Sequence, residues 1–478
     1  MEVNPALPPA TLTASNGPSI FRPSMADRPE PDGLIADVGG TAALTRHFAA
    51  GEKPAARHRL GVEHEKVLVL SGGRAPGYGD GISALLGKLS EEAGWTAVEE
   101  DGKVIALKRS SPAGMASVTL EPGGQFEVSD APRKSAAEAA AVMHGHLREL
   151  SGPARELGLR FLGVGFRPFG TIDDVPWMPK GRYRVMRAYL PTRGALAHDM
   201  MKRTATVQVN LDYADQADCA DKTRVAMGTS SLVTALWAAS PLVNGQPSGY
   251  QSYRASCWLA TDDDRCGLLP FVFDGQAEHF YDDYAAWALD VPMFFVYRGG
   301  HYLPAGGMTF RQFLDEGWRG ERATMADWEL HLSTLFPEVR LKQYLEMRGA
   351  DAGPIDNVLA LPAIYRGLLY DAEARAAAWQ LVAGWTFEER QALRREVPQA
   401  GLRTKVRGEA IAGRCLELVA IAKEGLRRLA AEEDLALLDP IERIAETGRT
   451  AADAILEIHA ETGGDPDRIA DAIAIPLG

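Results

Sequence analysis

The segment 61–70, GVEHEKVLVL, places two glutamates one residue apart, ahead of a run of aliphatic side chains. Such a run predicts a buried strand, and successive side chains of a strand point to opposite faces. Glu63 and Glu65 should therefore share one face. Two neighbouring carboxylates on a largely apolar strand repel each other and are costly to bury, so the pattern requires something that offsets this cost.

A second strand is predicted around 205–213, where Gln208 and Asn210 fall on one face and aliphatic side chains on the other. The simplest explanation of such alternation is an antiparallel sheet with one solvated side. Glutamine and asparagine are, however, disfavoured in strands. A row of hydrogen-bonding side chains along a cavity explains these two residues better.

The segment 339–348 alternates in the same way and is predicted as a single strand. One of its faces would carry the polar side chains Arg340, Lys342, Tyr344, Glu346 and Arg348. Arginine matches the geometry of carboxylates and phosphates, whereas a glutamate can bind a metal ion. This strand therefore suits the binding of anions and of metal ions equally.

Two further glutamates, Glu121 and Glu127, flank the Pro-Gly-Gly sequence at 122–124. A solvated hairpin would explain this segment alone, although Pro-Gly-Gly also permits a bulge or another unusual backbone path. Together with Glu63 and Glu65, these residues supply four carboxylates on short strands. Mg²⁺ prefers carboxylate oxygens and usually keeps water and substrate phosphates as further ligands. We therefore expect a magnesium site, whose charge would balance the glutamates.

Three regions are predicted along the chain. Residues 1–33 are rich in proline and have little periodicity, which predicts a disordered tail. Residues 34–360 mix strands with helices, such as the alanine-rich helix expected at 135–158, and would form the catalytic domain. Residues 361–478 show helical periodicity and capping residues, which predicts a helical C-terminal region packed on that domain.

The chain has 478 residues and a formal net charge of −13. An acidic chain is a poor candidate for non-specific binding to nucleic acid or to anionic membranes. No apolar stretch approaches the roughly 20 residues that span a bilayer, and the N-terminus shows no secretory signal. The four cysteines form no C-x-x-C pair, so we expect reduced thiols and a cytoplasmic protein.

Basic side chains also occur outside the predicted strands. They cluster in MPKGRYRVMR at 178–187, and Arg203 and Arg254 follow. Most of them should lie on the surface, and a minority should contact a ligand. Neither a P-loop nor a dinucleotide-binding glycine motif is present.

Long, ordered motifs across roughly residues 40–440 resemble the plant-type glutamate–cysteine ligases, a family that also occurs in bacteria. Among these motifs are GVEHEK, TLEPGGQFE, RFLGVGFRP, PWMPKGRY, DMMKRTATVQVNLD and FPEVRLKQYLEMRGAD. The resemblance implies an α+β fold related to glutamine synthetase, in which a curved antiparallel sheet forms an active-site funnel with helices packed around it. It also implies the ATP- and Mg²⁺-dependent ligation of the γ-carboxylate of glutamate to the amine of cysteine through a γ-glutamyl phosphate. This reaction is the first step of glutathione biosynthesis.

The resemblance also suggests roles for individual residues. The glutamates that it places near metal ions are Glu63, Glu65, Glu121, Glu127 and Glu346. The catalytic residues, acting on carboxylate or phosphate groups, would be Arg254 and Arg340. The substrate-binding residues would be Arg203, Gln208, Asn210, Trp287 and Arg348. Small-molecule substrates are the implied partners, and the protein is expected to be a monomer or a weak homodimer.

Some positions depart from the family and leave alternatives open. Val67, Cys266 and Trp287 stand where the family usually has phenylalanine, threonine and tyrosine. If these positions line the acceptor pocket, the protein would be a γ-glutamyl ligase of the same fold with another amine acceptor. A non-catalytic ligand sensor is a second alternative, which the intact carboxylate set argues against because unused buried charge destabilises a fold.

A thiol–disulfide switch is not expected. Plant members carry regulatory cysteines at four positions that are here Ala140, Ala305, Gly320 and Leu359. None of the cysteines of this chain occupies one of these positions. Activity should therefore respond little to oxidation or to reducing agents.

Overall fold

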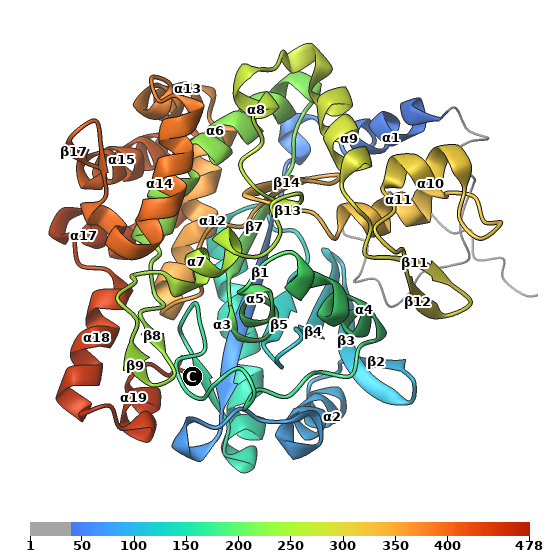
Figure 1. Cartoon of the computed structure of the whole chain (residues 1–478). Coiled ribbons are helices and arrows are strands. Elements are labelled where there is room, and N and C mark those ends of the chain that lie inside the picture. Colours follow the sequence, from blue (N-terminus) through green and yellow to red (C-terminus); the bar gives the residue numbers. More distant parts are fainter. Residues whose placement is uncertain (1–39) are drawn as a thin grey trace, which may run out of the picture.

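The computed structural model describes residues 40–478 and shows the expected α+β architecture (Figure 1). A large antiparallel sheet forms the centre, and helices pack around it. The tail predicted at 1–33 lies outside the described residues.

The main sheet contains nine strands within residues 40–478, and each of its strand pairs is antiparallel. In spatial order, eight of them are β14 (Val339–Leu341), β15 (Leu345–Met347), β7 (Val207–Leu211), β1 (Leu60–Val69), β5 (Phe126–Ser129), β4 (Gly114–Leu120), β3 (Lys103–Ser111) and β2 (Thr96–Glu100). The ninth, β6 (Arg160–Leu162), pairs with the end of β1. Strands that are distant in the sequence thus lie side by side, which brings the predicted polar strands together.

The central strand β1 has the two faces that its sequence predicts. It pairs with β7 on one side and with β5 on the other, through Glu63 opposite Gln208 and Glu65 opposite Glu127. Glu63 and Glu65 line a cavity on the front face, whereas Lys66 on the back face is fully buried. The predicted shared face of the two glutamates is confirmed.

The segment 339–348 is a hairpin and not the single strand predicted from its alternation. β14 pairs with β15, so Arg340 lies directly opposite Glu346. Lys342 and Tyr344 close the turn through a backbone hydrogen bond of 2.9 Å from N to O. Alternation cannot distinguish one long strand from two short ones, because opposite residues of an antiparallel pair also share a face.

Three long helices pack behind or beside the sheet. They are α3 (Ala136–Leu157), α6 (Gln216–Leu236) and α12 (Ile355–Tyr370). α3 and α12 contact β1, and α6 contacts β14 and β15. The predicted helix α3 begins after Ser135, whose Oγ accepts a hydrogen bond from Glu138 N, and ends at the left-handed Gly158. Most buried side chains of the sheet and these helices form one large core, and a smaller cluster lies around the end of β1 and β6.

A second layer covers the front of the sheet. α4 (Gly181–Tyr189) and α5 (Ala197–Arg203) lie on the β4–β5 side, whereas α7 (Tyr253–Leu259) and α11 (Met325–Leu332) lie next to the β14–β15 hairpin. Other helices of this part of the chain are α1 (Thr41–Ala49), α2 (Ser83–Glu92), α8 (Phe271–Asp274), α9 (Phe280–Asp290) and α10 (Phe310–Glu316).

The C-terminal part of the chain is helical, drawn in orange to red in Figure 1. Its helices are α13 (Ala372–Val382), α14 (Phe387–Ala400), α15 (Ala412–Arg428), α16 (Glu432–Leu435), α17 (Asp439–Thr447), α18 (Ala451–Thr462) and α19 (Pro466–Ala472). The left-handed Gly448, with φ 68°, separates α17 from α18. α13, α14 and α15 pack against α6. The predicted boundary between 360 and 361 falls inside α12, and the division into domains stays a prediction.

Across 40–478, no helix combines the length and the apolar content that crossing a bilayer requires.

Candidate active site

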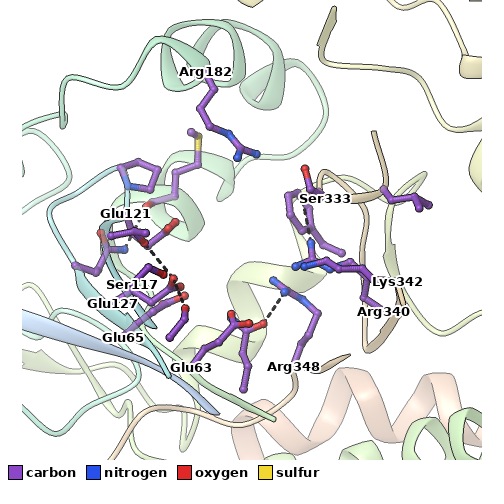
Figure 2. A pocket seen from close by; sticks show the side chains of 18 of the residues that line it. Glu63, Glu65, Ser117, Glu121, Glu127, Arg182, Ser333, Arg340, Lys342 and Arg348 are labelled. Atoms are coloured by element: carbon purple, nitrogen blue, oxygen red, sulfur yellow. Dashed lines mark hydrogen bonds between the residues drawn. The ribbon is translucent and has the colours of Figure 1, made fainter. Parts of the chain in front are cut away.

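A cavity of about 360 Å³ opens on the front face of the sheet (Figure 2). Its walls come from β1, β4, β5, β7, the β14–β15 hairpin, α4, α5 and the end of α11. The predicted site residues that line it are Glu63, Glu65, Glu121, Glu127, Gln208, Arg340 and Arg348. Those buried directly behind them are Asn210, Arg254 and Glu346. A cavity of this volume is within the range of small-molecule sites.

Four carboxylates gather on the left of this cavity in Figure 2. Glu63 and Glu65 come from β1, Glu127 from β5, and Glu121 from the turn after β4. Burial raises the pKa of Glu63 to about 7, and the charges of Glu346 and Glu127 add to this effect. Burial and the charges of Glu121 and Glu127 also raise the pKa of Glu65 well above its usual value. Like charges therefore crowd together, and a bound cation would relieve their repulsion.

Hydrogen bonds orient three of these carboxylates. The pairs are Asn210 Nδ2 to Glu63 Oε1 (2.8 Å), the Thr206 backbone N–H to Glu65 Oε2 (3.1 Å) and Thr119 Oγ1 to Glu127 Oε1 (3.0 Å). Each of these donors occupies one carboxylate oxygen and fixes the plane of the group. The side chains are thus positioned before any ligand binds, which lowers the ordering cost of binding.

The Pro-Gly-Gly turn that carries Glu121 is a tight hairpin turn. Gly124 has φ 82°, and its N–H donates to Glu121 O at 2.9 Å. Gly123 lies against the backbone of Lys202, where a Cβ atom would come within 2.0 Å of the carbonyl oxygen. Gln125 Nε2 donates to two backbone carbonyls at the end of α5, at 2.7 and 3.2 Å. Both glycines are needed, one for its backbone conformation and the other for close packing.

Three cations form the opposite wall of the cavity, called the basic wall here: Arg340, Lys342 and Arg348. They surround the carboxylate of Glu346, with Arg340 Nη2 at 2.6 Å from Oε1 and Lys342 Nζ at 2.8 Å from Oε2, while Arg348 Nη1 also contacts Oε1. Burial alone would raise the pKa of Glu346, but the three cations outweigh it and hold this pKa well below its usual value. The excess of positive charge suits anionic groups of a ligand.

Gln208 and Arg254 support the basic wall from different sides. Gln208 Oε1 accepts a hydrogen bond from Arg348 Nη1 at 2.6 Å. Arg254 lies behind the wall, next to a much smaller cavity of about 30 Å³, and its Nη2 donates to Arg348 O at 2.8 Å. Asp351 lies 3.9 Å from the same guanidinium. Arg254 is not part of the wall of the main cavity, but its charge lowers the pKa of Glu65, which is, and its catalytic role stays a prediction.

Arg203 and Trp287 do not line the cavity either, and their substrate-binding roles stay predictions. Arg203 Nη2 donates to Gly170 O at 3.0 Å, and its guanidinium pairs with Asp199 at 3.2 Å. Trp287 packs on Tyr284 of α9, with ring centroids 5.2 Å apart. Nothing in the local pattern of α5 or α9 indicates which side of the helix faces the cavity.

The other positions that depart from the family also lie outside the cavity wall. Val67 shares a face of β1 with Glu63 and Glu65 but is buried in a separate core cluster outside the cavity wall. Cys266 lies at the start of the short strand β10 (Cys266–Gly267) and is not part of the cavity wall either. None of the three positions Val67, Cys266 and Trp287 is therefore part of the lining of this cavity.

Some residues of the cavity wall were not assigned to the site from the sequence. Lys342 and Lys180 line it, as does Gln125. The alternation of 339–348 contained a signal for Lys342, and the basic cluster at 178–187 contained one for Lys180. Gln125 carried no signal, because its role depends on a turn that the sequence left undetermined.

The carboxylate cluster fits a hard divalent cation by its donors and charge. Within the described residues, no three His, Cys, Asp or Glu side chains already surround a common point as a metal site would. Burial and mutual repulsion nevertheless raise the pKa of Glu63, Glu65 and Glu127. A bound cation would reduce this repulsion and favour the charged carboxylates. Carboxylate oxygens are also the donors that Mg²⁺ prefers. Glu346 stays a predicted ligand only, since both of its oxygens accept bonds from the basic wall.

Comparison with known proteins identifies the family of this chain. Residues 59–472 match the model of glutamate–cysteine ligase family 2. The chain belongs to this family. It is 43% identical over 87% of its length to the chloroplastic glutamate–cysteine ligase of Brassica juncea, covering 80% of that protein. It is likewise 43% identical to the chloroplastic enzyme of Arabidopsis thaliana, covering 87% of this chain and 79% of that protein.

A solved structure supports the fold. The crystal structure of a glutamate–cysteine ligase from Francisella tularensis, in complex with AMP, matches with a TM-score of 0.51 and covers 87% of each chain. The sequence identity is 15%, so this likeness concerns the fold alone. The expected α+β fold and family are both confirmed.

The comparisons correct the expected location. The cysteine pattern and the missing secretory signal predicted a cytoplasmic protein, but the plant relatives are named as chloroplastic. Reduced thiols indicate a reducing environment and do not distinguish one such compartment from another. The prediction of a cytoplasmic protein was therefore wrong.

Proposed function

We propose that this protein is a glutamate–cysteine ligase that uses ATP and Mg²⁺ to join the γ-carboxylate of glutamate to the amine of cysteine. The activity, which is the first step of glutathione synthesis, follows from family membership and from 43% identity over 87% of the chain. The structural observation that carries the proposal is the cluster of four carboxylates facing the basic wall across one cavity.

The chemistry explains why both halves of the cavity are charged. A carboxylate is a poor electrophile, so the γ-carboxylate of glutamate first attacks the γ-phosphorus of ATP and ADP leaves. The amine of cysteine then attacks the γ-glutamyl phosphate, inorganic phosphate leaves, and the ammonium formed loses a proton. Negative charge spreads over phosphate oxygens in both steps, and preorganised positive groups stabilise it.

The residues of the basic wall would bind the anionic groups. Arg340 and Arg348 offer guanidinium donors to a carboxylate or phosphate, and Lys342 adds a point charge. Gln208 and Arg254 would keep Arg348 in position through the bonds described above. The negative charge of Glu346 would partly offset the repulsion among the three cations.

The carboxylate cluster would hold the metal. Glu63, Glu65, Glu121 and Glu127 would be its ligands, and bound Mg²⁺ would neutralise phosphate charge. The orientation of three of these carboxylates is already set by hydrogen bonds. Asn210 would act indirectly by orienting Glu63.

The test is ADP release with ATP, Mg²⁺, glutamate and a panel of amines. We expect release to require glutamate and to be fastest with cysteine, with γ-glutamylcysteine as the product detected by mass spectrometry. Efficient turnover with another amine and rejection of cysteine would overturn the assignment of the acceptor. Failure to release ADP with any amine would overturn the ligase activity itself.

The quaternary structure is a separate proposal. A monomer or a weak homodimer fits a site whose proposed residues all belong to one chain. Sedimentation velocity over a range of protein concentrations would test it, and a stable larger oligomer at low concentration would contradict it.

A further inference from the structure

A buried ion pair lies behind the basic wall, outside the main cavity. Arg265 and Asp262 follow helix α7, and neither side chain is accessible to solvent. Arg265 Nε donates to Asp262 Oδ2 at 2.7 Å. Desolvating two charges is costly, and replacing such a pair by apolar side chains is often neutral or stabilising. The stability of the fold therefore does not by itself explain this pair.

The other donors of Arg265 hold two chain segments that follow helices. Nη1 donates to Thr334 O at 3.2 Å, just after α11, and Nη2 donates to Pro292 O at 2.7 Å, just after α9. The guanidinium carbon lies 3.9 Å from the ring centroid of Phe294, which is a cation–π contact. Because the guanidinium is planar and its donors have fixed directions, this one side chain fixes three segments relative to one another.

Arg340 of the basic wall binds the same segment as Arg265. Its Nη1 donates to Ser333 O at 2.9 Å and to Leu335 O at 3.0 Å (Figure 2). The carbonyl between these two belongs to Thr334 and is the one that Arg265 binds. The two arginines therefore alternate along three successive carbonyls. Because each residue has only two soft backbone dihedral angles, a rotation at Thr334 would redirect the neighbouring carbonyls as well.

Backbone pairing ties the same segment to Arg265. The carbonyl of Arg265 accepts a hydrogen bond from Phe336 N at 2.7 Å, and β10 pairs in parallel with β13 (Phe336–Pro337). Ser333 and Phe336 line the main cavity, whereas Arg265 does not. The segment 333–336 is thus held from behind and contributes to the cavity wall in front.

The contacts of Arg340 extend this support to the whole basic wall. The two carbonyls hold Nη1, and Nη2 donates to both oxygens of Glu346, at 2.6 and 2.9 Å. Glu346 also accepts bonds from Lys342 and Arg348. A shift of the carbonyls at 333–335 would therefore move the guanidinium of Arg340, and with it the carboxylate that all three cations share.

We propose that Arg265 is a positioning residue of the ligase reaction, which fixes Arg340 and the basic wall through the carbonyls of residues 333–335. The inference rests on the proposed function, because it assumes that the basic wall acts on anionic groups of the substrates. The alternative is a purely structural role, in which Arg265 only joins the segments after α7, α9 and α11. Both roles predict a less stable protein when Arg265 is changed, but only the first predicts a loss of activity that depends on Arg340.

The main test variant is Arg265→Lys. It keeps a positive charge beside Asp262 but replaces the planar guanidinium by a single ammonium group, which cannot reproduce the directions of the three donors. Phe294→Leu is a milder second variant, because it removes only the ring beside the guanidinium and leaves the hydrogen bonds in place. It serves the same test if Arg265→Lys does not fold.

Arg390→Lys is the matched control. Arg390 is also buried, lies 4.6 Å from the ring centroid of Phe273 and donates to Val382 O at 2.6 Å. None of these three residues lines the main cavity. The control therefore changes a buried arginine with the same kinds of contacts at a place that does not support the basic wall.

The experiment is a double-mutant cycle with Arg340→Lys, measured as kcat/KM for glutamate by ADP release. Radiolabelled ATP extends the assay to slow variants, and melting temperatures fix an assay temperature at which all variants are folded. Arg265→Lys should lower kcat/KM by roughly 10- to 100-fold, the loss expected when a binding group moves by about 1 Å. In the Arg340→Lys background the same change should cost less than about 3-fold, because the group that Arg265 positions is already gone.

The other variants complete the expected pattern. Phe294→Leu should lower kcat/KM by roughly 3-fold in the wild-type background, the scale of a cation–π contact, and by less beside Arg340→Lys. Arg390→Lys should stay within about 2-fold of the wild type even where its melting temperature falls as far as that of Arg265→Lys.

Three results would overturn the inference while leaving the ligase activity intact. The first is a wild-type kcat/KM in Arg265→Lys. The second is the same fold loss in both backgrounds, which would make the role of Arg265 structural only. The third is an equal loss in Arg390→Lys, which would assign the effect to general destabilisation. Absence of ADP release by the wild-type protein with any amine would instead contradict the proposed function itself.

Discussion

Replacing Glu63 with glutamine should stabilise the metal-free protein at neutral and alkaline pH. The carboxylate lies in the cluster with Glu65 and Glu127, and burial raises its pKa to about 7. Glutamine keeps an oxygen that can accept the hydrogen bond from Asn210 Nδ2. The substitution therefore removes the charge while preserving most of the local geometry.

The magnitude follows from the difference in pKa between the folded and the unfolded chain. The pKa of Glu63 rises from its ordinary value of about 4.5 in the unfolded chain to about 7 on folding. At a pH below both pKa values, Glu63 is protonated in the folded and in the unfolded chain, so its ionisation does not affect the free energy of unfolding. As the pH rises between them, only the unfolded chain loses its proton, so folding becomes less favourable by up to roughly 3 kcal/mol. The glutamine variant does not lose this stability, because glutamine does not ionise.

Urea unfolding in the presence of EDTA would measure the effect at about pH 5 and about pH 8. The gain of Glu63→Gln over the wild type should be larger at the higher pH. Glu346→Gln is the matched control with the opposite sign, because the basic wall holds the pKa of Glu346 well below its usual value. Its removal leaves three buried cations without their partner and should cost about 3–5 kcal/mol at the higher pH.

The reasoning would be refuted if Glu63→Gln changed stability by the same amount at both pH values. It would also be refuted if Glu63→Gln and Glu346→Gln shifted stability in the same direction at about pH 8. Adding Mg²⁺ provides a further check, since it should stabilise the wild type more than Glu63→Gln if the carboxylate is a ligand.

Three further predictions concern activity, packing and redox behaviour. Glu121→Gln should fold normally but lose most turnover, because an amide is a weak Mg²⁺ ligand; a near-normal rate at ordinary Mg²⁺ would remove Glu121 from the metal site. Gly123→Ala should lower the melting temperature by several degrees, because its Cβ would lie 2.0 Å from Lys202 O; Gly152→Ala, with nothing within 4 Å, is the control that should not. Mild oxidation and dithiothreitol should change turnover little. Three of the four free cysteines are buried, and burial raises the pKa of the half-buried Cys266 to about 12, which keeps its thiol protonated. A several-fold change in turnover would contradict this prediction.

Alternation along single strands predicted much of the site because it depends only on local geometry. Glu63 and Glu65 share a face in any strand, whatever it pairs with. The unusual Gln208 and Asn210 correctly indicated polar contacts, since one binds Arg348 and the other Glu63. These inferences needed no knowledge of the sheet order.

Residues on helices were harder to assign, because a basic or aromatic side chain can face any neighbour. Arg203 is buried, and its Nη1 and Nη2 groups bind Asp199 and backbone carbonyls. Trp287 lies among the aromatic side chains of its own helix and the core. Arg254 is close to the site but donates to the backbone of Arg348. In each case the residue type suggested a contact with a ligand, whereas the side chain contacts another part of the protein.

The distribution of charged and apolar residues in the cavity depends on the order of the strands in the sheet. The sequence pattern of a single strand does not reveal this order. The basic wall comes from residues near 340, the carboxylates from residues near 64 and 124, and the methionines of the cavity wall from residues near 186 and 200. Only the order β15–β7–β1–β5–β4 places the carboxylates between the other two. In the proposed reaction between two anionic groups, a cation held by these carboxylates would reduce the repulsion at the point where the groups meet. The long-range pairing of β1 with both β5 and β7 is therefore what turns separate polar strands into one reaction site.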